Sequence, residues 1–172
     1  AVNAIMNAAN PCYIRALDNE VNEVFDPVKN KNFKWGQAKR WVAYTDDGLL
    51  VGRIAAFTND KYINKGTDFK TGGVGFFDCI NDQATANLIF DTAKEWLFSM
   101  GVEAMDGPIN FGDRDKWWGL MVEGFDKEPM YGMSFNPSYY QALFEGYGFK
   151  NYYNQYYYYL NVEDPLPEKF PE

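Results

Sequence analysis

Gly73-Val-Gly-Phe-Phe-Asp-Cys-Ile80 is the part of the chain from which the architecture can be built. This short, nearly unbroken apolar run is typical of a strand buried on both faces. Asn81 or Asp82 follows, and either side chain can cap a helix by accepting an orphan backbone N–H. A helix is then predicted up to Gly101, because apolar residues recur on one face of a 3.6-residue period at Ile89, Ala93, Trp96, Leu97 and Met100.

The signals upstream of this unit predict a hairpin and a helix. Residues 40–45 and 49–57 have strand character, and Asp46-Asp-Gly48 between them tolerates the positive φ of a tight turn. A helix is predicted over residues 16–25 from the apolar spacing of Leu17, Val21, Val24 and Phe25.

The downstream signals are shorter. A strand is predicted at residues 102–105, a short helix within 114–124, and a helix over 138–146 with Pro137 at its first turn. The aromatic run at 152–160 predicts a last strand. Helices that lie between strands indicate an α/β (α+β) fold, in which helices pack on a mixed sheet.

Composition limits the possible chemistry. The 172 residues carry a net charge of -8, which disfavours nucleic acid and anionic membrane surfaces as partners. The absence of histidine excludes Ser-His-Asp catalysis and His-ligated zinc. Two cysteines are too few for a four-thiolate site or a disulfide framework, so we expect no metal and a cytoplasmic location.

A resemblance to a known family follows from Leu143-Phe-Glu-Gly-Tyr-Gly-Phe149, read together with the strand-cap-helix unit at 76–100. The pair resembles the acyl-coenzyme-A core of the GNAT superfamily of N-acetyltransferases, over roughly residues 40–160. The resemblance implies a mixed, mostly antiparallel central sheet with helices on both faces. We expect a single domain over residues 1–162, in which the usual first strand is not evident, and a tail or linker at 163–172.

The resemblance also implies acetyl-CoA, or another acyl-CoA, as cosubstrate. A helix N-terminus suits its pyrophosphate, because unpaired N–H groups and a partial positive charge meet there. The chain departs from the superfamily loop where Ala84 replaces the first glycine and where Asp82 adds negative charge. A plain helix cap without ligand is the alternative at residues 81–86. The expected cofactor-binding residues are Phe77, Cys79, Ile80, Asp82, Gln83, Ala84, Thr85, Ala86, Asn136 and Phe144.

Two residues are catalytic candidates within this resemblance. Asp78 is the candidate general base, since a carboxylate is often found on this strand, and pairing within the sheet is its alternative role. Phe144 replaces the tyrosine that often protonates the leaving thiolate, so Tyr140, one helical turn earlier, is the candidate acid, with packing as its alternative. Trp117 and Trp118 are substrate candidates, because large flat rings suit apolar or amine ligands, with core packing as their alternative. Asn110 is the third substrate candidate.

Two functions of different classes follow. The first is an N-acetyltransferase that moves an acyl group from acyl-CoA to an amine, either a small molecule or a peptide. The second is a catalytically inactive GNAT-like module that binds a ligand or partner, favoured by Ala84 and Phe144. Exposed aromatic residues on the last predicted strand would allow a homodimer.

Overall fold

The structure is a computed structural model that describes residues 2–61 and 69–163. Its central sheet has the strand order β1-β2-β3-β4. The first three strands are antiparallel, and β4 runs parallel to β3. The strands are β1 (Gly36–Tyr44), β2 (Leu50–Asn59), β3 (Thr71–Cys79) and β4 (Ala104–Asp106).

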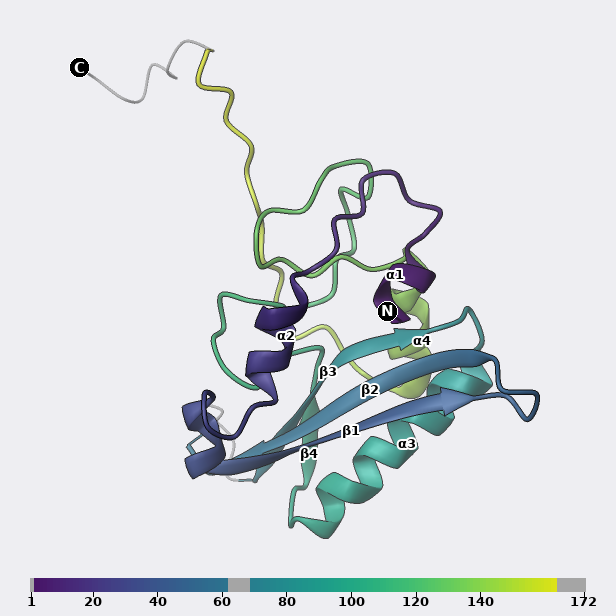
Figure 1. Cartoon of the computed structure of the whole chain (residues 1–172), viewed down its shortest axis with the longest axis vertical. Helices are drawn as coiled ribbons and strands as arrows, with labels where there is room; N and C mark the ends of the chain where they lie inside the picture. Colours follow the sequence, from purple (N-terminus) through teal and green to yellow (C-terminus); the bar gives the residue numbers. More distant parts are fainter. Residues whose placement is uncertain (1, 62–68, 164–172) are drawn as a thin grey trace.

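Helices cover both faces of this sheet (Figure 1). The pair α3 and α4 packs on one face, whereas α2 lies over the other. This arrangement confirms the predicted α+β fold with a mixed, mostly antiparallel sheet. The helices are α1 (Val2–Met6), α2 (Asp18–Val24), the 3-10 helix η1 (Lys31–Lys34), α3 (Gln83–Ser99) and α4 (Tyr140–Tyr147).

The larger core lies between the sheet and the α3–α4 pair. The fully buried ring of Phe90 stacks on Phe77 of β3, with 4.7 Å between centroids. Phe144 of α4 meets both rings edge-on. Buried aromatic side chains of this kind each remove about 150–250 Å² from water, so this cluster fixes α4 against β3.

A smaller core lies on the opposite face of the sheet. Phe57 of β2 stacks on Phe111 with 5.3 Å between centroids. Phe25 packs at a tilt against Phe57 and edge-on against Phe76. Because Phe25 directly follows α2, this core holds the N-terminal segment over that face of the sheet.

The carboxyl half of β3 is irregular, and on one side no described strand pairs with it. Phe76 and Phe77 together oppose the single residue Ile54 of β2, which is a β-bulge, and Phe76 has a φ of 49°. β4 pairs with β3 only as far as Gly73. Among the described residues, no strand continues beside β3 from there to Cys79, although the N–H of Ile109 donates to the carbonyl oxygen of Val74 at 2.8 Å.

Two predicted elements are wrong. Residues 114–124 form turns rather than a helix, because Trp117, Gly119 and Gly124 all have positive φ angles. Residues 152–160 are extended and exposed, but no strand among the described residues pairs with them (Figure 1, yellow). Residues 164–172 of the predicted tail lie outside the described residues.

Candidate functional site

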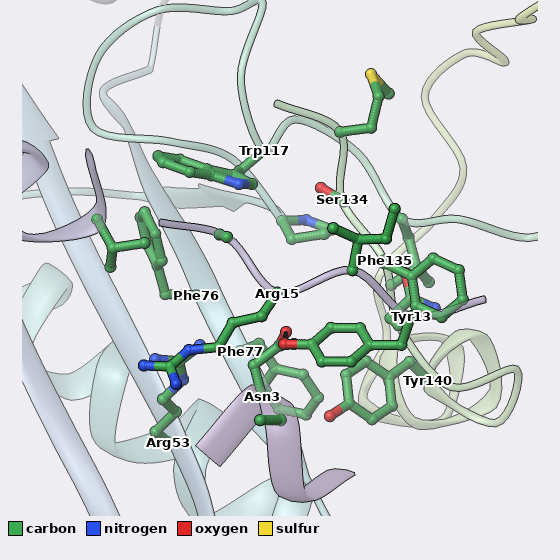
Figure 2. A pocket seen from close by; sticks show the side chains of 18 of the residues that line it. Asn3, Tyr13, Arg15, Arg53, Phe76, Phe77, Trp117, Ser134, Phe135 and Tyr140 are labelled. Atoms are coloured by element: carbon green, nitrogen blue, oxygen red, sulfur yellow. Dashed lines mark hydrogen bonds between the residues drawn. The ribbon is translucent and has the colours of Figure 1, made fainter. Parts of the chain in front are cut away.

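A pocket opens at the carboxyl end of β3, on the sheet face away from α3 (Figure 2). Its cavity volume is ≈ 130 Å³. We call it the Tyr140 pocket; its lining includes Asn3, Tyr13, Arg53, Trp117, Phe135 and Tyr140. Residues from α1, β2, β3, α4 and the long loop before α4 therefore meet at one point.

Asp78 lies directly behind this pocket and is completely buried. Oδ2 accepts from Arg53 Nε at 2.5 Å, and Oδ1 accepts from Asn3 Nδ2 at 2.8 Å and from the Tyr140 hydroxyl at 3.2 Å. Burial raises the pKa of Asp78 above its ordinary value, whereas Arg53 and the hydrogen bonds oppose that rise. The carboxylate is therefore more basic than an exposed one.

The β3 bulge explains why Asp78 faces the pocket. In a regular strand, side chains alternate between the two faces, and Asp78 would pair with Gly52. The extra residue at 76–77 brings Asp78 opposite Arg53 instead, on the face that carries the Tyr140 pocket. The ion pair between these two residues depends on this shift in register.

Tyr140 joins the carboxylate to the open edge of β3. Its hydroxyl accepts from the backbone N–H of Cys79 at 3.0 Å and donates to Asp78. Tyr139 donates to the carbonyl oxygen of the same Cys79 at 2.8 Å. Burial, and next the charge of Asp78, raise the pKa of Tyr140, so the phenol keeps its proton. The structure brings together the two catalytic candidates, and whether they are catalytic stays a prediction.

The start of α3 is capped by the chain itself. Asp82 accepts from the backbone N–H of Thr85 at 2.7 Å and from its hydroxyl at 2.6 Å. Gln83 is turned toward α4, where its Nε2 donates to the carbonyl oxygen of Leu143. Of the predicted pyrophosphate residues, Ala84 is exposed and Ala86 is buried under the helix. The cap that the sequence left open as an alternative is therefore present.

The other predicted cofactor residues fall into two groups. Phe77, Cys79 and Phe144 are buried in the larger core, although Phe77 and Phe144 also line the Tyr140 pocket. Ile80 is half-buried at the end of β3. Asn136 lines the pocket and fixes the long loop, since its side chain bonds both backbone groups of Met121. Burial raises the pKa of the Cys79 thiol to about 12, so the sulfur stays protonated.

The three substrate candidates are not brought together. Trp117 lines the Tyr140 pocket, whereas Asn110 and Trp118 line a second cavity. Sequence reasoning missed Arg53, Asn3 and Tyr13 of the site. Arg53 carried a signal, because it is the one charge within the otherwise apolar residues 49–57. Asn3 and Tyr13 carried none, since only the packing of α1 against the sheet brings them there.

Comparisons with known proteins give two curated relatives, and no family model matches the chain. Bacterial ceramide synthase of Caulobacter vibrioides is 30% identical over 169 residues, which cover 98% of this chain and 43% of that protein. Protein YghO of Escherichia coli is 34% identical over 110 residues, or 63% of this chain and 27% of that protein. The chain thus spans less than half the length of each.

Solved structures share the architecture at low sequence identity. Aminoglycoside acetyltransferase AAC(6')-Iy, in complex with a CoA bisubstrate analogue, matches with a TM-score of 0.51 and 11% identity, over 88% of this chain and 85% of that one. AAC(6')-IG of Acinetobacter haemolyticus matches with a TM-score of 0.50 and 12% identity, over 88% and 86%. Within the described residues, no helix has the length and apolarity needed to cross a membrane. The chain has the fold of the GNAT acetyltransferases.

Proposed function

We propose that the chain is an acyl-CoA-dependent N-acyltransferase, which transfers an acetyl or longer acyl group to an amine. The observation that carries this proposal is the arrangement at the end of β3. A strand edge beside which no described strand pairs beyond Gly73 ends at a buried Asp78–Tyr140 contact, and a partly apolar pocket lies directly beside that contact. Acyl transfer from CoA needs these three features side by side.

The open edge of β3 fits the amide-bearing arm of an acyl-CoA. Both backbone groups of Cys79 point away from β2, but the hydroxyls of Tyr140 and Tyr139 already bond them, so the arm would have to pair one step earlier in the strand. Residues two apart in a strand point their backbone groups to the same side, so Phe77 offers its N–H and C=O to the same edge. A bound acyl-CoA supplies the activated thioester. AAC(6')-Iy, which shares the fold, was solved with a CoA analogue bound.

The start of α3 fits the pyrophosphate less well. Asp82 already uses the N–H of Thr85, and its carboxylate repels phosphate. The N–H groups of Gln83 and Ala84 belong to the same first turn, where an anion is favoured. We therefore expect the affinity for CoA to come mainly from the arm along β3.

Asp78 and Tyr140 divide the proton transfer between them. Asp78 accepts the proton that the amine loses, through a water at the pocket wall, and its raised pKa suits a base. Tyr140 relays a proton: as its phenol proton moves to the leaving thiolate, the proton on Asp78 moves to the phenol oxygen along their hydrogen bond, so no phenolate forms. One C–N bond forms and one C–S bond breaks. The amine proton ends on the thiol of free CoA, and both side chains return to their starting states.

The pocket favours an amine with an apolar body. Ile14, Trp117, Met133 and Phe135 are among its lining residues, and its polar groups gather near Arg53. Apolar walls with a few polar groups fix a ligand's orientation. The name of the relative from Caulobacter vibrioides, ceramide synthase, denotes N-acylation of a long-chain amine. A long-chain amine is thus the first acceptor to test.

The second candidate function is an inactive binding module, and the Asp82 cap is the observation that favours it. A chain that no longer places pyrophosphate at Thr85 binds acyl-CoA weakly, or binds another ligand through the pocket alone. Such a module shows no turnover with any amine, whereas the acyltransferase shows sustained turnover with at least one.

Thiol release from acyl-CoA tests the proposal. Acetyl-CoA and long-chain acyl-CoA are each combined with a long-chain amine, an aminoglycoside and a peptide amine. Asp78→Asn and Tyr140→Phe are expected to lower kcat by about 10²-fold or more. Matched controls are Asp91→Asn and Tyr147→Phe, because these two residues form the same carboxylate–phenol hydrogen bond outside the pocket.

The controls are expected to retain the full rate. Wild-type turnover in the Asp78→Asn variant would remove Asp78 as the base. Acyl-CoA binding by calorimetry without thiol release for any pair would overturn the acyltransferase and leave the binding module.

A further inference from the structure

A second cavity of ≈ 190 Å³ lies at the other end of β3. We call it the Thr71 pocket; it is lined in part by Asn59, Lys61, Thr71, Asn110, Arg114 and Trp118. It shares no lining residue with the Tyr140 pocket. Thr71 lies seven residues before Asp78 in the same strand, so these two residues are about 20 Å apart along β3.

Within residues 2–61 and 69–163, two buried oxygens in this lining have no hydrogen-bond partner. They are Oγ1 of Thr71, which is 3% exposed, and Oδ1 of Asn110, which is 6% exposed. Buried polar side-chain atoms in folded proteins nearly always have a partner. Asn59 in the same lining follows the rule: it donates to Asn32 and accepts from the N–H of Lys61. The cavity therefore has unused acceptors for hydroxyl or amine groups of a ligand.

The charge of the lining narrows the class of ligand. Among the described lining residues, Lys61 and Arg114 are cationic and none is acidic, and Asp60, Asp113 and Asp115 flank the two cations in the sequence. Lys61 Nζ lies 3.7 Å from the ring centroid of Trp35, and the Arg114 guanidinium lies 5.0 Å from that of Trp118. Contact with a ring face attracts a cation without neutralising it. The charged side chains among the described lining residues are both positive, which favours an anion inside the cavity.

We propose that the Thr71 pocket binds a small anion that also carries hydroxyl groups, of the class of a polyol phosphate. The anionic group accepts from Lys61 and Arg114, while the hydroxyls donate to Thr71 Oγ1 and Asn110 Oδ1. An amine ligand would satisfy the two oxygens but would be repelled by the cations. A simple anion would pair with the cations and accept from the Thr71 hydroxyl, but it would leave Asn110 Oδ1, which can only accept, unpartnered. The same chemistry is available from a free metabolite or from a phospholipid headgroup.

Calorimetric titration of the full chain with sn-glycerol 3-phosphate is the first test, with glycerol and inorganic phosphate as partial ligands. We expect the phosphate ester to bind at least tenfold more tightly than either. Thr71→Val and Asn110→Leu preserve shape and remove the two oxygens, and each is expected to weaken binding at least fivefold. Arg114→Gln is expected to do the same, whereas Lys127→Gln, an exposed lysine outside the cavity, retains full affinity.

Sedimentation with vesicles distinguishes the two sources. Binding to phosphatidylglycerol vesicles but not phosphatidylcholine vesicles, with loss in the three pocket variants, supports the headgroup; binding of the free ester alone supports the metabolite. Thermal melting without ligand checks folding. Thr71→Val is expected to melt no lower than wild type, because it removes an unpartnered buried oxygen.

The proposal is overturned if neither the ester nor the vesicles bind. It is equally overturned if Thr71→Val and Asn110→Leu bind as wild type does, which would leave ordered water as the occupant. Neither assay contains acyl-CoA or an amine, so the result is independent of the acyltransferase proposal.

Discussion

Replacing Arg53 with glutamine is the sharpest perturbation of the site, because it leaves the buried carboxylate of Asp78 without its cationic partner. Asp78 is fully buried, and Arg53 is its cationic partner at 2.5 Å. Removing one member of a buried ion pair costs about 3–5 kcal/mol. The Arg53 side chain retains 26% exposure, so the lower end, about 3 kcal/mol, applies. For a domain of this length that loss lowers the melting temperature by roughly 6–12 °C.

The loss should depend on pH with a defined sign. Burial raises the folded-state pKa of Asp78 above its ordinary value of 3.8, so the folded chain holds a proton that the unfolded chain has released. The free energy of unfolding then falls as the pH rises from the ordinary pKa of Asp78 to its folded-state pKa; we call this range the titration window. Without Arg53 the pKa rises further, and the titration window extends upward. The Arg53→Gln loss is therefore full at about pH 8 and smaller at about pH 5.5.

Chemical denaturation at the two pH values measures both effects, with Lys127→Gln as the control for loss of one exposed cation. The double variant Arg53→Gln/Asp78→Asn removes the stranded charge and is expected to recover more than half of the lost free energy. A loss that is the same at both pH values, or a double variant no more stable than Arg53→Gln, would refute the argument that Asp78 is held as a carboxylate by Arg53.

Three further predictions concern the donor site, the core and the reaction. Asp82→Ser keeps a capping oxygen and removes a charge, so CoA should bind about fivefold more tightly by calorimetry, and unchanged affinity would mean that pyrophosphate does not approach α3. Phe90→Ala should cost about 3–5 kcal/mol in denaturation, whereas Phe98→Ala on the exposed face of the same helix should cost under about 0.5. The acid limb of kcat/KM should lie above pH 3.8 because the pKa of Asp78 is raised, and Asp78→Asn should abolish it.

Elements with local signals were predictable from the sequence. The Asp-Gly turn gives a hairpin in which Gly48 has a φ of 84°. Asp82 caps α3, and Gly101 follows its end with a φ of 74°. Each of these outcomes depends on a few neighbouring residues, which is why the sequence alone predicts them.

Elements that depend on distant partners were not predictable. The tyrosines at 152–160 have high strand propensity, but a strand forms only where another strand pairs with it. The bulky residues near Trp117 resemble a helical face, yet Trp117 has a φ of 46° and donates its N–H to Gly132. Long-range packing of the loop therefore overrides the local pattern.

The candidate site was predictable in part for the same reason. Asp78 and Tyr140 follow from the resemblance, and they are in hydrogen-bond contact. The supporting contact from Asn3 joins residues 75 positions apart, and no local pattern encodes it. The β3 bulge also leaves no recognisable pattern in the sequence, because the residues that form it look like part of an ordinary apolar strand.

That bulge also decides how β3 responds to a change in its length. It gives the strand one residue more than its pairing with β2 requires. Deleting Phe76 would leave Phe77 opposite Ile54 and Asp78 opposite Arg53, so β3 would become regular while Asp78 kept its face. Inserting one residue between Phe77 and Asp78 has no such compensation, because Asp78 would then lie opposite Gly52 and turn toward the aromatic core under α3. Loss of a residue at the bulge should therefore be tolerated better than gain of a residue after it.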